Sequence, residues 1–247
     1  MKIKLKITKK HGYTLNISKR YKSIKTIVPI GCDCHPAYML KALNLRKQSL
    51  PFDWLDTQSE YGIKYAHENI NNQFKFFLSE LKKNNEGKVY SNNYKYAVFY
   101  HYDDLITNKK LQLKIKERCI KLIELIKNKP IYFLNTVTSE SINSNEKINI
   151  FLNSIITFKN ILKRKDFLII YLRYDETHDE NKIFCDKLID KLEMFHKNIK
   201  IIKYVREKEL FGIWGDEKKY LKLIKKMGIT IYPIFPKVTV NKIKHKN

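Results

Sequence analysis

Two closely spaced cysteines mark the part of the chain best suited to covalent chemistry. They lie in Gly31-Cys-Asp-Cys-His-Pro-Ala37, between an apolar run and a helical pattern that begins near Pro36. A thiol just before a helix lies near unpaired backbone N–H groups and the positive end of the helix dipole, and both favour the thiolate. Asp33 opposes this effect because two negative charges repel. The stretch predicts a nucleophilic thiol on Cys32 or Cys34.

A nucleophilic thiol needs a base that takes its proton and a third group that orients the base. His101 is the best candidate for the base because it ends a predicted strand at 94–100. The third group is left open by the spacing alone, since Asp103, Asp104 and Asn135 all follow strands. His35 is a rival base, but its closeness to the cysteines favours a role in capping the helix.

Further polar residues follow other predicted strands. Because ligands of open parallel sheets bind at the carboxyl ends of the strands, residues that are far apart in sequence converge at this edge. Gly31 permits a turn that comes close to a ligand, and Arg46 could hold an anion near the helix N-terminus. The predicted ligand-binding residues are Gly31, Arg46, Ser49, Asp53, Asn135 and Arg173.

Two patterns suggest metal ligands, and neither is complete. Cys32, Cys34 and His35 could form half of a zinc site, but the sequence has no second close pair of Cys or His residues to complete it. His178 lies among acidic residues at 175–179 and could bind a metal with them. Such a cluster more often caps a helix. The sequence therefore predicts no metal site and no cofactor.

Strand and helix patterns alternate along most of the chain. Short apolar runs predict strands at 26–30, 94–100, 130–134, 167–172, 199–205 and 229–234. Amphipathic periodicity predicts helices at 36–43, 63–70, 74–81, 111–127, 146–162, 184–195 and 217–227. This order predicts an α/β fold, with a largely parallel sheet and helices on both faces. Pro29 predicts that the first of these strands ends early or lies at an edge.

The first residues of the chain predict a β-hairpin. Lysines alternate with Ile and Leu at 2–8, and apolar residues alternate again after Gly12. The lysines could protect a sheet edge from aggregation or bind an anion, and we favour edge protection. The predicted organisation is one α/β domain over 1–247, with a basic hairpin at 1–22 and a core at 26–234.

The chain is strongly basic, with a formal net charge of +24. Such a charge is typical of proteins that bind nucleic acid or an anionic membrane surface. The lysines are scattered, however, and Lys, Asn, Ile, Tyr and Phe all have AT-rich codons, which favours a compositional origin. Residues 1–25 are the exception, since they carry nine Lys or Arg and no Asp or Glu. A nucleic-acid partner is therefore possible but not favoured.

No apolar run approaches the roughly 20 residues that a membrane-spanning helix needs. The N-terminus also lacks the continuous apolar segment of a secretory signal. We therefore expect a cytoplasmic protein with reduced thiols.

Two blocks of the chain match a known family pattern. They are Ile30-Gly-Cys-Asp-Cys-His-Pro-Ala-Tyr-Met-Leu-Lys41 and Leu45-Arg-Lys-Gln-Ser-Leu-Pro-Phe-Asp-Trp54. These blocks resemble the DUF1796 family, which is described as papain-like cysteine peptidases. With Gly31 and Ala37 aligned, the cysteine of the family falls on Cys34. The resemblance therefore implies that Cys34 is the nucleophile.

Weaker matches extend the resemblance over about 26–227. His101-Tyr-Asp103 looks like the His-Asp pair that follows a strand in the family, and Trp214-Gly-Asp216 also fits. These matches imply that His101 is the base and that Asp103 orients it. A doubly wound parallel sheet is not the papain fold, so the implied peptidase activity depends on the Cys and His residues alone.

Three functions follow from these patterns, in order of preference. The first is a cysteine-dependent hydrolase with a Cys-His site at the carboxyl edge of the sheet. The second is a non-peptidase α/β enzyme or binding module for a phosphorylated or nucleotide-sugar ligand. The third is a basic protein that binds nucleic acid through the N-terminal hairpin. The substrate is not predicted by any of these patterns.

Overall fold

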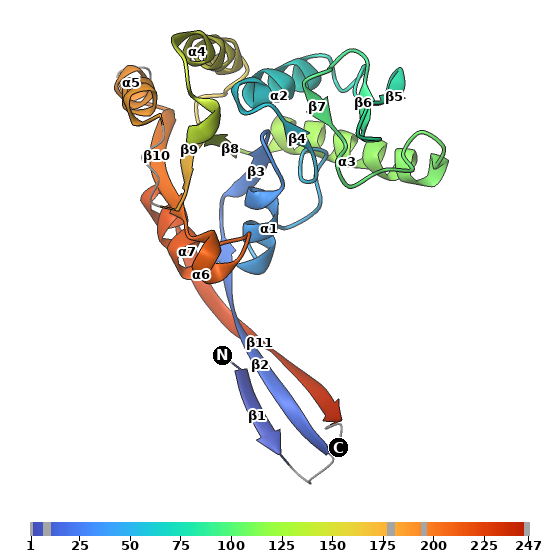
Figure 1. The fold of residues 1–247 in the computed structure, drawn as a ribbon, viewed down its shortest axis with the longest axis vertical. Coiled ribbons are helices and arrows are strands. Elements are labelled where there is room, and N and C mark those ends of the chain that lie inside the picture. The colour runs from blue at the N-terminus through green and yellow to red at the C-terminus, as the bar shows by residue number, and fades with distance from the viewer. Residues whose placement is uncertain (1, 7–10, 177–180, 194–196, 245–247) are drawn as a thin grey trace.

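The computed structural model describes residues 2–6, 11–176, 181–193 and 197–244. Within these ranges the chain forms a mixed α/β structure that contains a parallel sheet, as the sequence predicts, and a separate antiparallel sheet (Figure 1).

The parallel sheet has four strands. Their order is β10 (Ile199–Arg206), β9 (Phe167–Asp175), β8 (Ile131–Thr138) and β3 (Thr26–Ile30). Each strand pairs in parallel with its neighbour, and β8 and β9 are buried along almost their whole length. Such strands are rich in apolar residues because both of their faces are covered. β3 pairs with β8 alone in this sheet, so Pro29 lies in an edge strand, as predicted.

Helices connect these strands. They are α1 (His35–Ala42), α2 (Gly62–Asn71), α3 (Lys109–Asn128), α4 (Asn145–Lys159), α5 (Lys182–Glu193), α6 (Lys208–Phe211) and α7 (Glu217–Lys226), with 3-10 turns η1 (Ser59–Tyr61) and η2 (Ser139–Ser141). Three helices are capped at the N-terminus by a polar side chain that accepts a hydrogen bond from a backbone N–H. The capping residues are Asn108 for α3, Ser144 for α4 and Asp216 for α7.

Successive side chains along the strands of the parallel sheet pack alternately into two hydrophobic clusters. Val28 and Phe133 pack in one cluster with residues of α2, α3, α4 and α5. Ile27 and Leu134 pack in the other with residues of α1 and α7. This alternation follows from the two-residue period of a strand, in which successive side chains point to opposite faces of the sheet. The sheet therefore lies between the two clusters.

The antiparallel sheet contains the pairing of the predicted N-terminal hairpin and one further strand. It consists of β1 (Lys2–Lys6), β2 (His11–Ser23) and β11 (Ile231–Lys244), in that order. The predicted last strand therefore pairs with β2 instead of the core sheet, and it continues to Lys244. The three strands extend away from the parallel sheet (Figure 1). Met1 and residues 7–10 of the predicted hairpin lie outside the described residues.

Two predictions between α1 and α3 are wrong. The predicted strand at 94–100 is reduced to β7 (Ala97–Val98), which pairs antiparallel with β4 (Asp56–Thr57) and not with the parallel sheet. The predicted helix at 74–81 is a series of turns that leads into a hairpin of β5 (Leu81–Lys83) and β6 (Val89–Ser91). The helical pattern fails there because Phe74 has a left-handed backbone, with φ of 63°.

Candidate functional site

A left-handed turn leads from β3 to α1. Gly31 has φ of 72° and Cys32 has φ of 62°. A Cβ atom on Gly31 would lie 2.6 Å from the Cα of Gly62, so the close approach made by this glycine is to α2. The sequence predicts that this glycine approaches a ligand, and in the structure it approaches α2 instead. The Cys32 N–H donates to Thr57 Oγ1 at 2.8 Å, which ties the turn to β4.

Cys34 immediately precedes the first residue of α1, and its side chain is half-buried. Burial raises the pKa of its thiol to about 11, and the carboxylates of Asp33 and Asp56 add to this effect. The helix start does not outweigh them, because Asp33 Oδ1 already accepts the N–H of His35 at 3.0 Å and Pro36 has no N–H. The expected thiolate is therefore absent at neutral pH, and Cys34 is a protonated thiol.

Cys32 is buried beneath the same turn. Its Sγ lies 2.9 Å from Ser59 Oγ, which in turn lies 3.3 Å from Thr138 Oγ1. Burial raises the pKa of the Cys32 thiol to about 12. These contacts tie the turn to the carboxyl end of β8, and the thiol is less accessible than that of Cys34.

Arg173 and Asp33 join two strand ends, as the convergence argument predicts. Arg173 Nη1 donates to Asp33 Oδ2 at 2.5 Å, and the arginine side chain is 6% exposed. Burial alone would raise the pKa of Asp33, but the charge of Arg173 and its hydrogen bond hold that pKa below its ordinary value. Arg173 was predicted as a ligand-binding residue, and its charge is already balanced by that of Asp33.

The ion pairs continue from β9 to β10. Arg206 donates from Nε and Nη2 to the two carboxylate oxygens of Asp175, both at 2.6 Å, and Lys208 Nζ lies 3.0 Å from Asp175 Oδ2. Burial acts to raise the pKa of Asp175, but these cations lower it to about 2. A bidentate arginine fixes the carboxylate in one orientation. Ion pairs between arginine or lysine and aspartate therefore connect the strand ends at the carboxyl edge of the sheet.

Asn135 connects the two strands next to the turn. Its Nδ2 donates to the carbonyl oxygen of Ile30 at 2.8 Å, and its side chain is fully buried. Its Oδ1 has no hydrogen-bond partner within the described part of the chain. This side chain therefore positions the end of β3, and whether it also binds a ligand remains a prediction.

The loop after α1 holds three of the predicted residues. Arg46 Nη1 donates to Asp53 Oδ2 at 3.0 Å, and the N–H of Leu50 donates to the same oxygen at 3.0 Å. Burial raises the pKa of Asp53 to about 6 despite these two donors. Ser49 is half-buried on the same loop.

His101 and Asp103 lie on an exposed turn that follows β7. The ring of His101 packs edge-to-face on Trp54, with centroids 5.5 Å apart. Asp103 Oδ1 accepts a hydrogen bond from Lys88 Nζ at 3.1 Å. Within the described ranges, no hydrogen bond joins Cys34, His101 and Asp103. Their assembly into a catalytic triad therefore stays a prediction.

The other histidine of the turn, His35, is engaged on both ring nitrogens. Its Nε2 donates to the carbonyl oxygen of Trp214 at 3.0 Å, so its Nδ1 accepts from the Tyr171 hydroxyl at 3.0 Å. Burial and the positive charge of Arg173 together lower the pKa of His35 to about 4. The ring does not cap α1, contrary to the expectation, because it is held inside an aromatic cluster. It is also unavailable as a base.

Asp56 is not among the site residues that the sequence predicts. Its half-buried carboxyl has no hydrogen bond or ion pair among the described residues, although it lies near enough to Cys34 to raise the pKa of that thiol. Burial, followed by the charge of Asp33, raises the pKa of Asp56 to about 6. Asp56 also pairs with Val98 across the β4–β7 ladder, three residues before His101. The only sequence signal was a second Asp shortly after Asp53.

No group of three or more His, Cys, Asp or Glu side chains within the described ranges is arranged to hold a metal ion. His178 lies outside these ranges. In the part of the chain that the structure describes, each helix is too short or too polar to cross a membrane.

One comparison with known proteins found a match. The model of a family described as "Putative papain-like cysteine peptidase (DUF1796)" matches residues 25–200. This range contains both cysteines of the turn, Asp56, His101 and Arg173. It ends before Trp214-Gly-Asp216, so that part of the expected resemblance falls outside the match. No curated protein and no solved structure matches the chain.

Proposed function

We propose a cysteine-dependent acyl hydrolase function for this chain, which belongs to the DUF1796 family. The description of the family indicates a cysteine peptidase, and peptide bonds are one class of acyl substrate. The proposal names Cys34 as the nucleophile. It places the site at the carboxyl edge of the parallel sheet, where binding sites of such sheets lie.

One observation carries the proposal: the half-buried, protonated thiol of Cys34 lies within the electrostatic influence of the Asp56 carboxylate, which has no hydrogen bond or ion pair among the described residues. With its pKa raised to about 6, Asp56 is largely ionised at pH 7, yet it is more basic than an ordinary aspartate. A general base is most effective when its pKa lies near the working pH. Asp56 therefore suits the removal of a proton from Cys34 during attack.

The reaction then needs two steps. Cys34 Sγ attacks the carbonyl carbon of the substrate, and the thiol proton passes to Asp56 as the carbon–sulfur bond forms. The bond to the leaving group breaks, and Asp56 returns the proton to that group. A water molecule then hydrolyses the thioester with Asp56 again as base, which releases the acid and restores the thiol.

His101 is the second candidate base, with Asp103 as the residue that orients it. The pairing of β4 with β7 supports this second candidate, because it brings the turn that carries His101 next to the strand that carries Asp56. In this version the turn moves toward Cys34 when substrate binds, and the contact of His101 with Trp54 is lost. Catalytic hydrogen bonds are often long or incomplete before substrate binds.

The test is hydrolysis of p-nitrophenyl acetate and of a mixed library of fluorogenic peptides. Cys34→Ala should abolish turnover, whereas Cys185→Ala, which removes a buried thiol of α5, should leave it unchanged. Asp56→Asn should reduce kcat by about 10²–10⁴-fold. A larger loss for His101→Gln than for Asp56→Asn would identify His101 as the base. Full activity of Cys34→Ala would refute the proposal.

The two arginines that an anionic ligand would need are both paired with carboxylates. Arg46 is held by Asp53 and Arg173 by Asp33, and both carboxylates are more than three-quarters buried. A phosphorylated ligand would have to displace one of these carboxylates from its arginine. These pairs favour the hydrolase over the ligand-binding alternative.

A further inference from the structure

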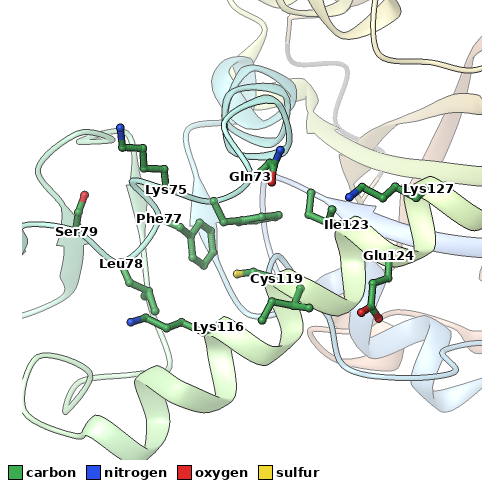
Figure 2. Close-up of a pocket in the computed structure, with 12 residues that line it drawn as sticks. Gln73, Lys75, Phe77, Leu78, Ser79, Lys116, Cys119, Ile123, Glu124 and Lys127 are labelled. Carbon is green, nitrogen blue, oxygen red and sulfur yellow. The ribbon is translucent and has the colours of Figure 1, made fainter.

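A cavity of about 560 Å³ lies between α3 and the turns that follow α2, and none of its lining residues belongs to the site described above. Figure 2 shows the side chains around it. Small-molecule sites of proteins are typically clefts of about 300–1,000 Å³ with mainly apolar linings. The size of this cavity is within that range.

Six of the twelve residues that line the cavity are apolar. The Cys119 sulfur points toward the ring of Phe77 (Figure 2), and the other apolar lining residues are Phe74, Leu78, Ile120 and Ile123. Burial raises the pKa of the Cys119 thiol to about 12, so this cysteine is a neutral wall residue at physiological pH. Ile120 is 60% exposed at the mouth, although it lies beside a buried core. A ligand with an apolar body would cover this surface.

One wall is built from strained backbone. Gln73 and Phe74 have φ of 54° and 63°, in the left-handed region that non-glycine residues rarely adopt. Two such residues in succession end α2 and turn the chain so that Phe74 and Phe77 line the cavity. Strain of this kind persists only where surrounding contacts impose it, and it is frequent at ligand sites.

The rim of the cavity is basic. Lys75, Lys116 and Lys127 line it together with Glu124, and no ion pair occupies these lysines within the described part of the chain. In Figure 2 the ammonium group of Lys127 points toward Ile123, whereas the charged ends of Lys75, Lys116 and Glu124 point outward from Cys119. The rim therefore offers a net positive charge next to an apolar interior.

From the apolar walls and the unpaired lysines at the rim, we propose that this cavity binds an amphiphilic anion, such as an alkyl carboxylate. The hydrocarbon chain packs between Phe77 and Ile123, and the anionic head group remains at the rim near Lys116 or Lys127. An uncharged or cationic head group would leave the lysines without a partner. This inference does not depend on the proposed hydrolase activity.

The test is calorimetric titration of the full chain with octanoate, decanoate and dodecanoate, each below its micelle concentration. Affinity should rise by about two- to fourfold for each added CH₂, because each buried CH₂ contributes favourable transfer free energy. Dodecyltrimethylammonium, which reverses the charge of the head group, should bind at least tenfold more weakly than dodecanoate. Equal affinity for the two head groups, or no dependence on chain length, would overturn the proposal.

Matched variants place the binding at this cavity. Lys116→Glu at the rim should weaken dodecanoate binding by fivefold or more. Lys114→Glu makes the same charge change at an exposed position of α3 that does not line the cavity, and it should leave binding unchanged. Ile120→Asp, also at an exposed position, should weaken binding by reducing the apolar surface at the mouth. Equal effects of the two lysine variants would show only non-specific attraction to a basic surface and would overturn the assignment.

Discussion

Arg173 Nη1 lies 2.5 Å from Asp33 Oδ2, across 140 residues of sequence. This pair joins the end of β9 to the turn before α1, and it therefore sets the position of Cys34 relative to the sheet. It also has a direct electrostatic role. Asp33 raises the pKa of Cys34, whereas Arg173 lowers it, so the pair supplies opposing charges next to the proposed nucleophile.

Arg173→Gln should destabilise the fold by about 3–5 kcal/mol, because it leaves the carboxylate of Asp33 without its cation in a largely buried setting. Urea unfolding monitored by circular dichroism measures this loss. The double variant Asp33→Asn/Arg173→Gln removes both charges and should recover at least half of it. A loss below about 1 kcal/mol in the single variant would show that solvent stabilises Asp33 without the arginine.

His35 should make the protein sensitive to mild acid. Its pKa is about 4 in the folded state against 6.5 for an ordinary histidine, so the unfolded state binds the proton first as the pH falls. Stability is therefore lost between pH 6.5 and 4, by on the order of 3 kcal/mol. Asp53 and Asp56 act in the opposite sense between about pH 6 and 4, because their folded pKa values are raised.

The comparison with His35→Gln isolates the histidine. The wild-type free energy of unfolding should fall relative to that of the variant as the pH is lowered from 7 to 4. Guanidinium unfolding curves at several pH values give this difference directly. Parallel pH profiles for the two proteins would contradict the assigned protonation state of His35.

Gly31→Ala should be among the most damaging single substitutions in the chain. The added Cβ would lie 2.6–2.8 Å from backbone atoms of Gly62, and the backbone has φ of 72°. We expect a loss of about 4 kcal/mol or more, or failure to fold. Gly87→Ala is the matched control, since it has φ of 76° but nothing within 4 Å of the added Cβ. It should cost only about 1–2 kcal/mol in thermal or urea unfolding.

The strands of the parallel sheet could be predicted because burial on both faces leaves a continuous apolar run in the sequence. The approach of Arg173 to the turn after β3 followed from the parallel arrangement, since both lie at carboxyl ends of strands, but its ion pair with Asp33 was not predicted. β11 was predicted only in its first part and in the wrong sheet. Its partner is β2, and pairing across more than 200 residues leaves no local signal for the choice of partner.

The environment of each side chain at the site could not be predicted. Asp56 differs from an ordinary surface aspartate only in its burial and in the nearby charge of Asp33, and both arise from the folded structure. The same holds for the raised pKa of Cys34, since spacing in the sequence favoured a thiolate. The left-handed backbone of Phe74 likewise has no signature in an apolar, helix-like pattern.

Asp56→Asn should have opposite effects on thiol reactivity and on catalysis. Asp56 raises the pKa of Cys34 by charge repulsion, so its removal lowers that pKa and increases the fraction of thiolate. Alkylation of Cys34 by iodoacetamide at pH 8 should therefore become faster, by severalfold. Hydrolysis should become slower, since the base that takes the thiol proton is lost.

Mass spectrometry of the alkylated peptides measures the rate at each cysteine. In the wild-type protein the Cys34 rate should rise by about tenfold per pH unit between pH 7 and 10, as expected for a thiol with pKa of about 11. Cys119, buried in α3, is the internal control, and its rate should not respond to Asp56→Asn. Faster alkylation together with unchanged hydrolysis would retain the electrostatic contact but exclude Asp56 as the base. Unchanged alkylation would show that Asp56 does not act on Cys34 at all.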